Sequence, residues 1–273
     1  MIKLFVTDID GTLLPAGSSV VPAKNVEAVQ AMIKEGVKVI IATGRMYKAA
    51  LPIAAQLGEH IPIIAYNGAM IKSSSGEILH AQYIDESTAI KLINFFEEHA
   101  WHLQSYSGEV LYVPKRNECV KLYEESQKVK AVEVGWEGLR EHARDVPKLL
   151  SISLNPDDIN ERMNEVKSFF GGQLEITRSH PMFAEFMATG ISKASAIKIL
   201  ADKFGINNAE TLAIGDSDND LAMITSVGCG VAMGNAVESV KAACPRITDT
   251  CERDGFAKAV YDYVLRKDLY GRD

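Results

Sequence analysis

Asp8-Ile9-Asp10-Gly11-Thr12 follows, after Thr7, on Ile2-Lys3-Leu4-Phe5-Val6, a short apolar run of the kind that forms a buried strand. Two carboxylates one residue apart at the end of a strand repel each other and lose solvation, so a positive partner must compensate them. A hard divalent cation such as Mg²⁺ is the simplest partner. Gly11 lets the backbone turn away from the strand, and the Thr12 hydroxyl can hold that turn through the freed backbone or a carboxylate. Asp-Gly alone would indicate only a strand-ending turn.

The composition is that of an ordinary globular protein. Its 273 residues are 47% apolar and 24% charged, which leaves room for two domains. The net charge is -7 and the basic residues are spread along the chain, which argues against partners such as nucleic acid or a membrane surface. No apolar run approaches the roughly 20 residues of a membrane span, and Met1 leads straight into the first strand, so we expect a cytoplasmic protein. The spacing of the four cysteines predicts neither a zinc site nor a disulfide framework.

The two ends of the chain alternate strands and helices. Apolar strands are predicted at 2–6, 37–41, 61–66, 211–214 and 228–232. Helices are predicted from Pro22 to Gly36, from about 45 to Gly58, at 192–204 and from about 255. Continuous apolar strands separated by helices indicate a parallel sheet covered on both faces, with ligands bound at the carboxyl ends of its strands. Asp8 and Thr43 lie at such ends.

The pattern changes from about residue 82 to 188. We expect a helix containing Ile90, Ile93 and Phe96, and further helices near 117–129 and 157–170. Strands are expected at 101–106, 110–113, 148–154, 173–178 and 182–187. Such mixing predicts an α+β insert with a sheet of its own. The predicted fold class is therefore α/β, with a discontinuous Rossmann-like core domain, residues 1–81 and 189–273, and an inserted α+β domain, residues 82–188.

Two later stretches add polar groups. Gly215-Asp216-Ser217-Asp218-Asn219-Asp220 places a second acidic cluster directly after the strand predicted at 211–214. Lys193, just behind Ser192 at a helix start, is the cation that an active-site phosphate would need, although a first-turn lysine is more often a solvated surface charge. The acidic stretch could also be a calcium loop. It lacks the glycine and the glutamate of that loop, however, and a strand precedes it.

These stretches, taken in order, resemble the four motifs of the haloacid dehalogenase superfamily of phosphatases. The residues that carry the resemblance are Asp8-Ile9-Asp10-Gly11-Thr12, Thr43, Lys193, and Gly215-Asp216 with Asn219-Asp220. The α+β insert between the second and third motifs resembles the Cof-like branch, whose cap domain lies there. The branch is also matched by Asn67-Gly68, Ala232-Met233-Gly234-Asn235-Ala236 and Asp254-Gly255. The motif lysine is commonly followed by Gly, whereas Lys193 precedes Ala194, a departure that touches no catalytic group.

The resemblance implies a role for each motif residue. Asp8 would be the nucleophile that forms an aspartyl phosphate, and Asp10 the acid and base. Mg²⁺ would be held by Asp8, by Asp10 through its backbone carbonyl, and by Asp216. The residues that would bind the phosphate and substrate are Ile9, Thr43, Gly44, Arg45, Lys193 and Asn219. Asp220 would orient the metal ligands and the lysine.

Several residues allow two interpretations. Arg45 could reach a substrate oxygen, but a surface arginine at a helix start is equally consistent with the sequence. Asn67 could serve the site, although Asn-Gly is first of all a turn. In the insert, a group that could touch substrate consists of Arg178, His180 and Glu185. The aromatic residues Trp101, Tyr106 and Tyr112 are expected to pack the insert rather than to stack on a base.

The resemblance implies a Mg²⁺-dependent phosphatase of a small soluble metabolite, such as a sugar phosphate, FMN or pyridoxal phosphate. A lid closing over the site would exclude water and select the leaving group. A phosphosugar mutase of the same superfamily is an alternative within enzymes. From another class comes a phosphometabolite-binding protein that has lost its chemistry, against which Asp8, Asp10 and Lys193 argue. We expect a monomer or weak dimer.

Overall fold

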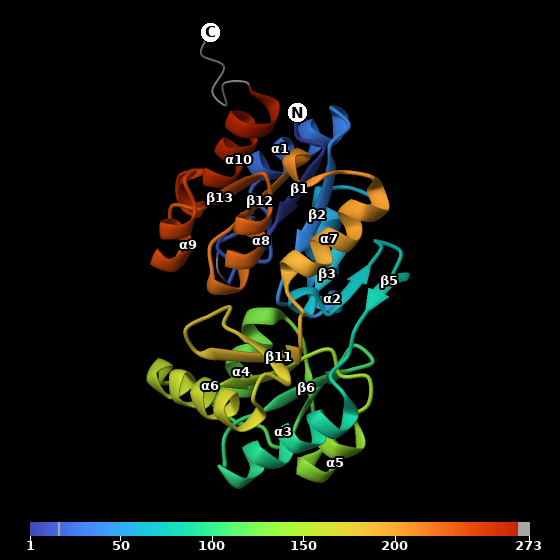
Figure 1. The fold of residues 1–273 in the computed structure, drawn as a ribbon, viewed down its shortest axis with the longest axis vertical. Helices are drawn as coiled ribbons and strands as arrows, with labels where there is room; N and C mark the ends of the chain where they lie inside the picture. Colours follow the sequence, from blue (N-terminus) through green and yellow to red (C-terminus); the bar gives the residue numbers. More distant parts are fainter. Residues whose placement is uncertain (16, 267–273) are drawn as a thin grey trace. The chain divides into compact units, whose positions relative to one another are not determined.

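The computed structural model describes residues 1–15 and 17–266 (Figure 1). Contacts between residues divide the chain into two compact units. The core unit comprises Met1–Leu79 and the chain from Ser192 onward, and the inserted unit comprises His80–Ile191. Within the described ranges, no helix is both long enough and apolar enough to cross a membrane.

The described part of the core unit contains a seven-stranded sheet in the order β13-β12-β1-β2-β3-β4-β5. Its strands are β1 (Leu4–Thr7), β2 (Lys38–Ala42), β3 (Ile63–Ala65), β4 (Met70–Lys72), β5 (Ile78–Ala81), β12 (Thr211–Gly215) and β13 (Cys229–Ala232). The last two residues of β5 are the first two of the inserted unit. The strands from β13 to β3 are parallel, whereas β4 runs antiparallel to β3. β1 and β12 are buried along their whole length, which confirms the predicted sheet covered on both faces.

Helices and short turns connect these strands. The helices are α1 (Ala23–Lys34), α2 (Tyr47–Leu57), α7 (Lys193–Phe204), α8 (Leu221–Ser226), α9 (Glu238–Ala243) and α10 (Gly255–Val260). The 3₁₀ turns are η1 (Tyr66–Gly68), η2 (Asn208–Glu210), η3 (Asp218–Asp220) and η4 (Cys251–Arg253), and η5 (Tyr261–Leu265) is a short π-helix. α1 packs against α2 and α10, while α7 packs against α8 in front of the sheet in Figure 1. α8 and α9 were not predicted, because each is too short to show a helical period.

The described part of the inserted unit has its own six-stranded sheet in the order β10-β11-β9-β6-β7-β8. Its strands are β6 (Gln104–Ser107), β7 (Val110–Val113), β8 (Ala131–Glu133), β9 (Leu149–Ile152), β10 (Leu174–Thr177) and β11 (Phe183–Ala188). Its helices are α3 (Glu86–Glu98), α4 (Glu118–Gln127), α5 (Gly135–Glu141) and α6 (Pro156–Phe170). β8 and α5 were missed by the sequence analysis, again because they are short.

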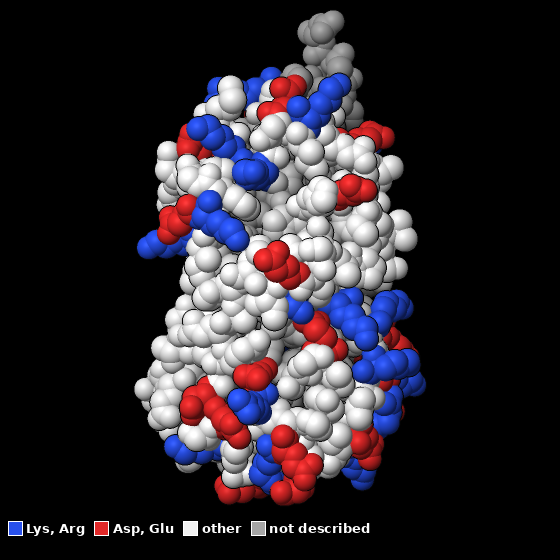
Figure 2. Space-filling view, turned by 90° about the vertical axis from the view of Figure 1, so that its right-hand side faces the viewer, with Lys and Arg blue, Asp and Glu red and all other residues white. Residues whose placement is uncertain are grey.

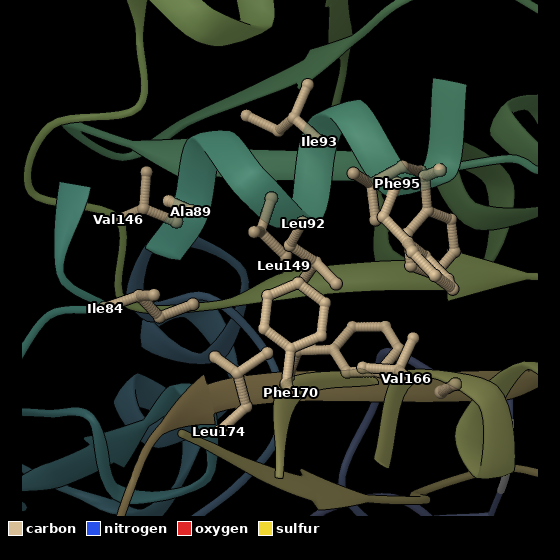
Figure 3. Packing of buried hydrophobic residues seen from close by; sticks show 14 of the residues in the cluster. Ile84, Ala89, Leu92, Ile93, Phe95, Val146, Leu149, Val166, Phe170 and Leu174 are labelled. Atoms are coloured by element: carbon tan, nitrogen blue, oxygen red, sulfur yellow. The ribbon is translucent and has the colours of Figure 1, made fainter. Parts of the chain in front are cut away.

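One apolar cluster joins α3, α5 and α6 of the insert to one face of its sheet (Figure 3). β11 shows how the strand period divides the two faces: Ala184 and Phe186 enter the cluster, whereas Glu185 points to the other side. Phe96 of α3 packs on Phe186 with ring centroids 5.6 Å apart. Trp101 and Tyr112 also pack against this cluster, as the sequence predicted.

The face drawn in Figure 2 carries basic and acidic side chains side by side.

Candidate active site

Four polar residues follow four neighbouring strands of the core sheet. Asp8 follows β1, Thr43 follows β2, Asn67 lies in the turn after β3, and Asp216 follows β12. Because these strands are parallel, all four residues lie at the carboxyl edge of the sheet. A ligand at this edge would meet groups from segments that are far apart in the sequence.

The loop after β1 turns at Gly11 and brings its backbone against Asp216. Gly11 has a φ of +75°, and a Cβ atom there would lie 2.6 Å from Oδ2 of Asp216. Thr12 donates its hydroxyl hydrogen to Oδ1 of Asp216 over 2.7 Å. Of the two partners foreseen for Thr12, backbone or carboxylate, the structure therefore selects a carboxylate.

Lys193 connects the first acidic cluster to the second. It is the first residue of α7, whose start is fixed by a capping box between Ser192 and Ser195. Its side chain is fully buried, and Nζ donates to Oδ1 of Asp8 and to Oδ1 of Asp220, each over 2.6 Å. Lys193 is therefore not a solvated surface charge but the positive centre of the site.

Asp220 holds this arrangement together. Its Oδ2 accepts hydrogen bonds from the backbone N–H groups of Asp216, over 2.9 Å, and Ser217, over 3.0 Å, while its Oδ1 accepts from Lys193. A Cβ atom on Gly215 would lie 2.5 Å from the Asp220 carboxyl carbon, so only glycine fits there. Asp220 thus orients both the lysine and the loop that carries Asp216. Asp218, by contrast, accepts a hydrogen bond from the Ser239 hydroxyl.

The single positive charge of Lys193 does not offset the negative charges of the carboxylates around it. Burial raises the pKa of Asp8 well above its usual value; Lys193 opposes this, and the neighbouring carboxylates add to it. Burial, followed by the charge of Asp220, raises the pKa of Asp216 to about 7. Burial alone would lower the pKa of Lys193, but the charges of Asp220 and Asp8 outweigh it and raise that pKa. One ammonium group is therefore shared by three carboxylates.

The donor set fits a divalent cation with a preference for oxygen. Among the described residues, carboxylate oxygens of Asp8, Asp216 and Asp220 lie within 4.8 Å of one another. Asp220 is held by the Lys193 ammonium and two backbone N–H groups, whereas both Asp216 oxygens accept from hydroxyls, those of Thr12 and Ser217, which can rotate when a cation binds. Asp8 and Asp216 are therefore the better candidates for carboxylate ligands. A cation bound to these two carboxyl groups would lower their raised pKa values, because it favours the ionised form. Mg²⁺ matches such a site because it binds through a few carboxylates and keeps several waters.

Asp10 is held by Arg45. The guanidinium of Arg45 donates through Nε to Oδ2 of Asp10 over 2.7 Å and through a second nitrogen to Oδ1. Arg45 is 5% exposed, whereas the Asp10 side chain is 38% exposed. The sequence placed Arg45 either on a substrate oxygen or at the surface. The structure buries it, which excludes the surface position, and pairs it with Asp10, the predicted acid and base. Contact of Arg45 with a substrate oxygen stays a prediction.

The remaining predicted residues surround the ends of β1 and β2. Thr43 is buried, and its hydroxyl oxygen accepts from the Arg45 N–H over 3.1 Å. Gly44 is partly exposed. The Ile9 side chain is fully buried, so Ile9 can meet a ligand only through its backbone. Asn219 donates through Nδ2 to Oδ1 of Asn67 over 2.9 Å.

Two residues near the site, Asn235 and Gly68, belong to the motifs of the resemblance, but the sequence analysis gave them no role. Asn235 donates to the carbonyl oxygen of Gly11 over 2.8 Å and accepts from the Cys251 N–H over 2.8 Å, so it ties the first loop to a later one. A Cβ atom on Gly68 would lie 2.2 Å from the carbonyl oxygen of Ser192, just before Lys193. Gly-Asn and Asn-Gly pairs are the signals in the sequence, but they do not reveal such distant partners.

Each of the three candidates in the inserted unit contacts a different residue. Arg178 donates to Asn160 over 3.0 Å, and His180 accepts from the Met182 N–H over 3.2 Å. Glu185 is buried and forms an ion pair with Lys148 over 2.5 Å. Tyr106, expected to serve packing, is also buried and donates its hydroxyl hydrogen to the Tyr123 oxygen over 2.7 Å.

An aspartate pair after a parallel strand, a buried lysine and a second acidic loop define a phosphoryl-transfer hydrolase of the α/β class. The model of the haloacid dehalogenase-like hydrolases matches residues 5–260. The chain belongs to this family, as its motifs indicated.

Relatives that match nearly the whole chain are named as phosphatases. A putative phosphatase of Bacillus subtilis, YxeH, is 30% identical over 98% of this chain and 100% of its own. The 5-amino-6-(5-phospho-D-ribitylamino)uracil phosphatase YcsE of the same organism is 33% identical over 97% of this chain and 96% of its own. This chain is a phosphatase of the same family.

Solved structures agree on both units. A haloacid dehalogenase-like hydrolase from Bacteroides thetaiotaomicron superimposes with a TM-score of 0.84 at 28% identity, covering 96% of this chain and 99% of that one. The subclass IIB sugar phosphatase BT4131 gives the same TM-score of 0.84 at 28% identity, over 96% of this chain and 98% of that one. The predicted fold class, an α/β core with an inserted α+β cap, is confirmed.

Proposed function

We propose that this protein is a Mg²⁺-dependent phosphomonoesterase that forms an aspartyl phosphate on Asp8. The observation that carries the proposal is the buried contact of Lys193 with Asp8 and Asp220, beside the carboxylate of Asp216. It supports the proposal that a nucleophile, a cation for phosphate and a set of metal ligands lie together at one edge of the sheet. Such a site can accept a dianionic phosphoryl group that isolated carboxylates would repel.

In the first half-reaction, an oxygen of Asp8 attacks phosphorus and the bond to the ester oxygen breaks. The departing alkoxide takes a proton from Asp10, so that a neutral alcohol leaves. Asp10 must then be protonated in the enzyme–substrate complex, and the Arg45 guanidinium that now binds both of its oxygens must yield one of them.

In the second half-reaction, water attacks the phosphorus of the aspartyl phosphate. Asp10 accepts a proton from that water, the acyl phosphate bond breaks, and Asp8 is restored as a carboxylate. Thr43, the Gly44 amide, Ile9 through its backbone, Asn219 and Lys193 bind the phosphate oxygens. Their donors stabilise the charge that spreads over these oxygens in both transition states.

Mg²⁺ would be held by Asp8, the Asp10 carbonyl and Asp216, and would supply charge neutralisation and alignment of the phosphate. Asp220 keeps Asp216 and Lys193 in place through the contacts described above. The test is direct: chelation should abolish phosphate release, Mg²⁺ should restore it, and Ca²⁺ should support it poorly because its larger, looser shell misplaces the phosphate. Full activity in the presence of chelator would contradict the site.

The substrate is proposed to be a small phosphorylated metabolite, either a sugar phosphate or a phosphorylated cofactor such as FMN or pyridoxal phosphate. Support comes from two relatives, one named for a phosphorylated ribityl compound and the other for sugar phosphates. We further propose that residues 82–188 act as a cap that selects the substrate. Their own sheet and apolar core suit a separate module for that task.

Phosphate release across a panel of phosphometabolites with Mg²⁺, with Asp8→Asn as the blank, tests this function. Selective turnover of some members supports a phosphatase of small metabolites. A bisphosphate activator added to phosphosugar assays separates hydrolysis from the mutase reaction, since a mutase returns the phosphoryl group to sugar. If phosphate were released from no member of the panel, the proposal would be contradicted.

A further inference from the structure

Two buried amides meet where β3 and the acidic loop of η3 come together. Asn67 is 1% exposed and Asn219 is 9% exposed. Nδ2 of Asn219 donates one hydrogen to Oδ1 of Asn67 over 2.9 Å. Oδ1 of Asn219 has no hydrogen-bond partner within the described chain. A buried amide oxygen without a partner is costly, which indicates a place that a ligand or its bound water completes.

The segment that carries Asn67 is fixed by two other parts of the site. The Asn67 N–H donates to the carbonyl oxygen of Thr43 over 3.0 Å. Asn67 is in the left-handed conformation, with φ 57° and ψ 22°, which asparagine tolerates better than most residues. The next residue, Gly68, lies so close to Ser192 that a Cβ atom would meet its carbonyl oxygen at 2.2 Å. The turn therefore holds Asn67 in register with Thr43 and with the start of α7.

An amide nitrogen carries two hydrogens, and the contact with Asn67 uses one of those on Asn219. That contact also fixes the plane of the Asn219 amide. The second hydrogen can then be directed to a phosphate oxygen without the side chain having to search its rotamers when the ligand arrives.

We propose that Asn67 is a positioning residue, which orients the Asn219 amide for the phosphate group. This inference rests on the proposed function, because it takes Asn219 as a phosphate donor. Asn67 acts through Asn219 and makes no contact with the reacting atoms in this role. Its removal should therefore matter only while Asn219 is present.

A double-mutant cycle with Asn67→Gly and Asn219→Ala tests the proposal. Glycine adopts the left-handed backbone without strain, so Asn67→Gly removes the amide and keeps the turn. Two readouts are used: the Kd of inorganic phosphate with Mg²⁺ by calorimetry, and kcat and KM for p-nitrophenyl phosphate. In the wild-type background, we expect Asn67→Gly to weaken phosphate binding and raise KM by about five- to tenfold.

In the Asn219→Ala background, the same Asn67→Gly exchange should change both readouts by less than about twofold, since the group that Asn67 orients is gone. If Asn67→Gly damaged the site in general, it would weaken phosphate binding in the Asn219→Ala background as well, and it would also lower kcat. Lys128→Gly is the matched control, because Lys128 is also left-handed, with φ 55°, but caps α4 in the inserted unit. It should leave phosphate binding unchanged.

Independent, additive effects of the two exchanges would overturn the role of Asn67, as would an Asn67→Gly variant that binds phosphate like wild type. The proposed function is judged separately. If the wild type binds phosphate but hydrolyses no ester, the phosphatase proposal fails, while the cycle on phosphate binding still decides whether Asn67 positions Asn219.

Discussion

Arg45 binds both carboxylate oxygens of Asp10, and this pair links the loop after β2 to the loop after β1. A bidentate guanidinium fixes the plane of a carboxylate as well as its position. Since Asp10 is the proposed acid and base, Arg45 can control catalysis without touching the phosphate. Orientation of Asp10 is a role for Arg45 that the sequence did not suggest.

Arg45→Lys should therefore reduce turnover according to the leaving group. A lysine keeps the charge but cannot bind both oxygens, so Asp10 loses its fixed orientation. We expect a loss in kcat/KM of about tenfold for a primary alkyl phosphate, whose alkoxide needs a proton. The loss for p-nitrophenyl phosphate should be about twofold or less, because its phenolate leaves unprotonated. Steady-state kinetics with both esters measures the ratio.

Arg140→Lys is the control for that experiment, because Arg140 pairs with Glu97 over 2.5 Å in the inserted unit. It should leave both substrates unaffected. Equal losses for the two esters from Arg45→Lys would mean that Arg45 binds the phosphate itself, as the sequence alone allowed.

Asp8→Asn should abolish hydrolysis. The exchange keeps the shape of the side chain but removes the nucleophile and a metal charge, so kcat/KM should fall by at least about a thousandfold, equivalent to about 4 kcal/mol. Asp249→Asn serves as control, since Asp249 pairs with Lys258 at the surface. Retention of a tenth of wild-type activity by Asp8→Asn would exclude the aspartyl phosphate.

Stability without metal should fall as the pH rises. The Asp216 carboxyl has a pKa of about 7 in the folded protein against 3.8 for an ordinary aspartate. Between these two values the folded state binds a proton that the unfolded state has released, so the free energy of unfolding decreases with increasing pH across that window. Above about pH 7 the ionised, buried carboxylate persists as a constant penalty.

Urea unfolding of the chelated protein at about pH 5 and about pH 8 tests this linkage. The wild type should lose more stability between the two values than Asp216→Asn, which cannot ionise. Mg²⁺ should restore the wild type at the higher pH, because it binds the ionised form. Equal pH dependence in the two proteins would show that Asp216 ionises normally.

Glu185→Ala should act first on stability. It would leave the Lys148 ammonium buried without the carboxylate that now lies 2.5 Å away, and we expect a loss of about 3–5 kcal/mol in the free energy of unfolding. The double variant Lys148→Met with Glu185→Leu should recover most of that loss. Glu97→Ala, which breaks a more exposed pair, should cost no more than about 1 kcal/mol.

Denaturant unfolding of the three variants gives these values. A small loss from Glu185→Ala would mean that the pair is open to water. Selectivity for substrates should be compared in the double variant, where a change in preference cannot be ascribed to unfolding of the cap.

The sequence by itself determined where the candidate catalytic groups lie on the fold. Buried strands ending in Asp8, Thr43 and Asp216 are visible as local patterns, and a parallel sheet must bring their carboxyl ends to one edge. The change of pattern near residue 82 likewise predicted a second sheet. Short elements such as β8 and α5 were not predicted, because a few residues are too few to show a hydrophobic period.

Only the tertiary structure decided which side chain meets which partner. Lys193 lies 185 residues from Asp8 in the chain, and Asn219 lies 152 residues from Asn67, yet both pairs are hydrogen-bonded. A long side chain such as that of Arg45 has more than one partner open to it in the sequence, and the folded structure pairs it with Asp10. Local sequence sets the direction of each strand and turn, whereas contacts between distant segments depend on how all of them pack together.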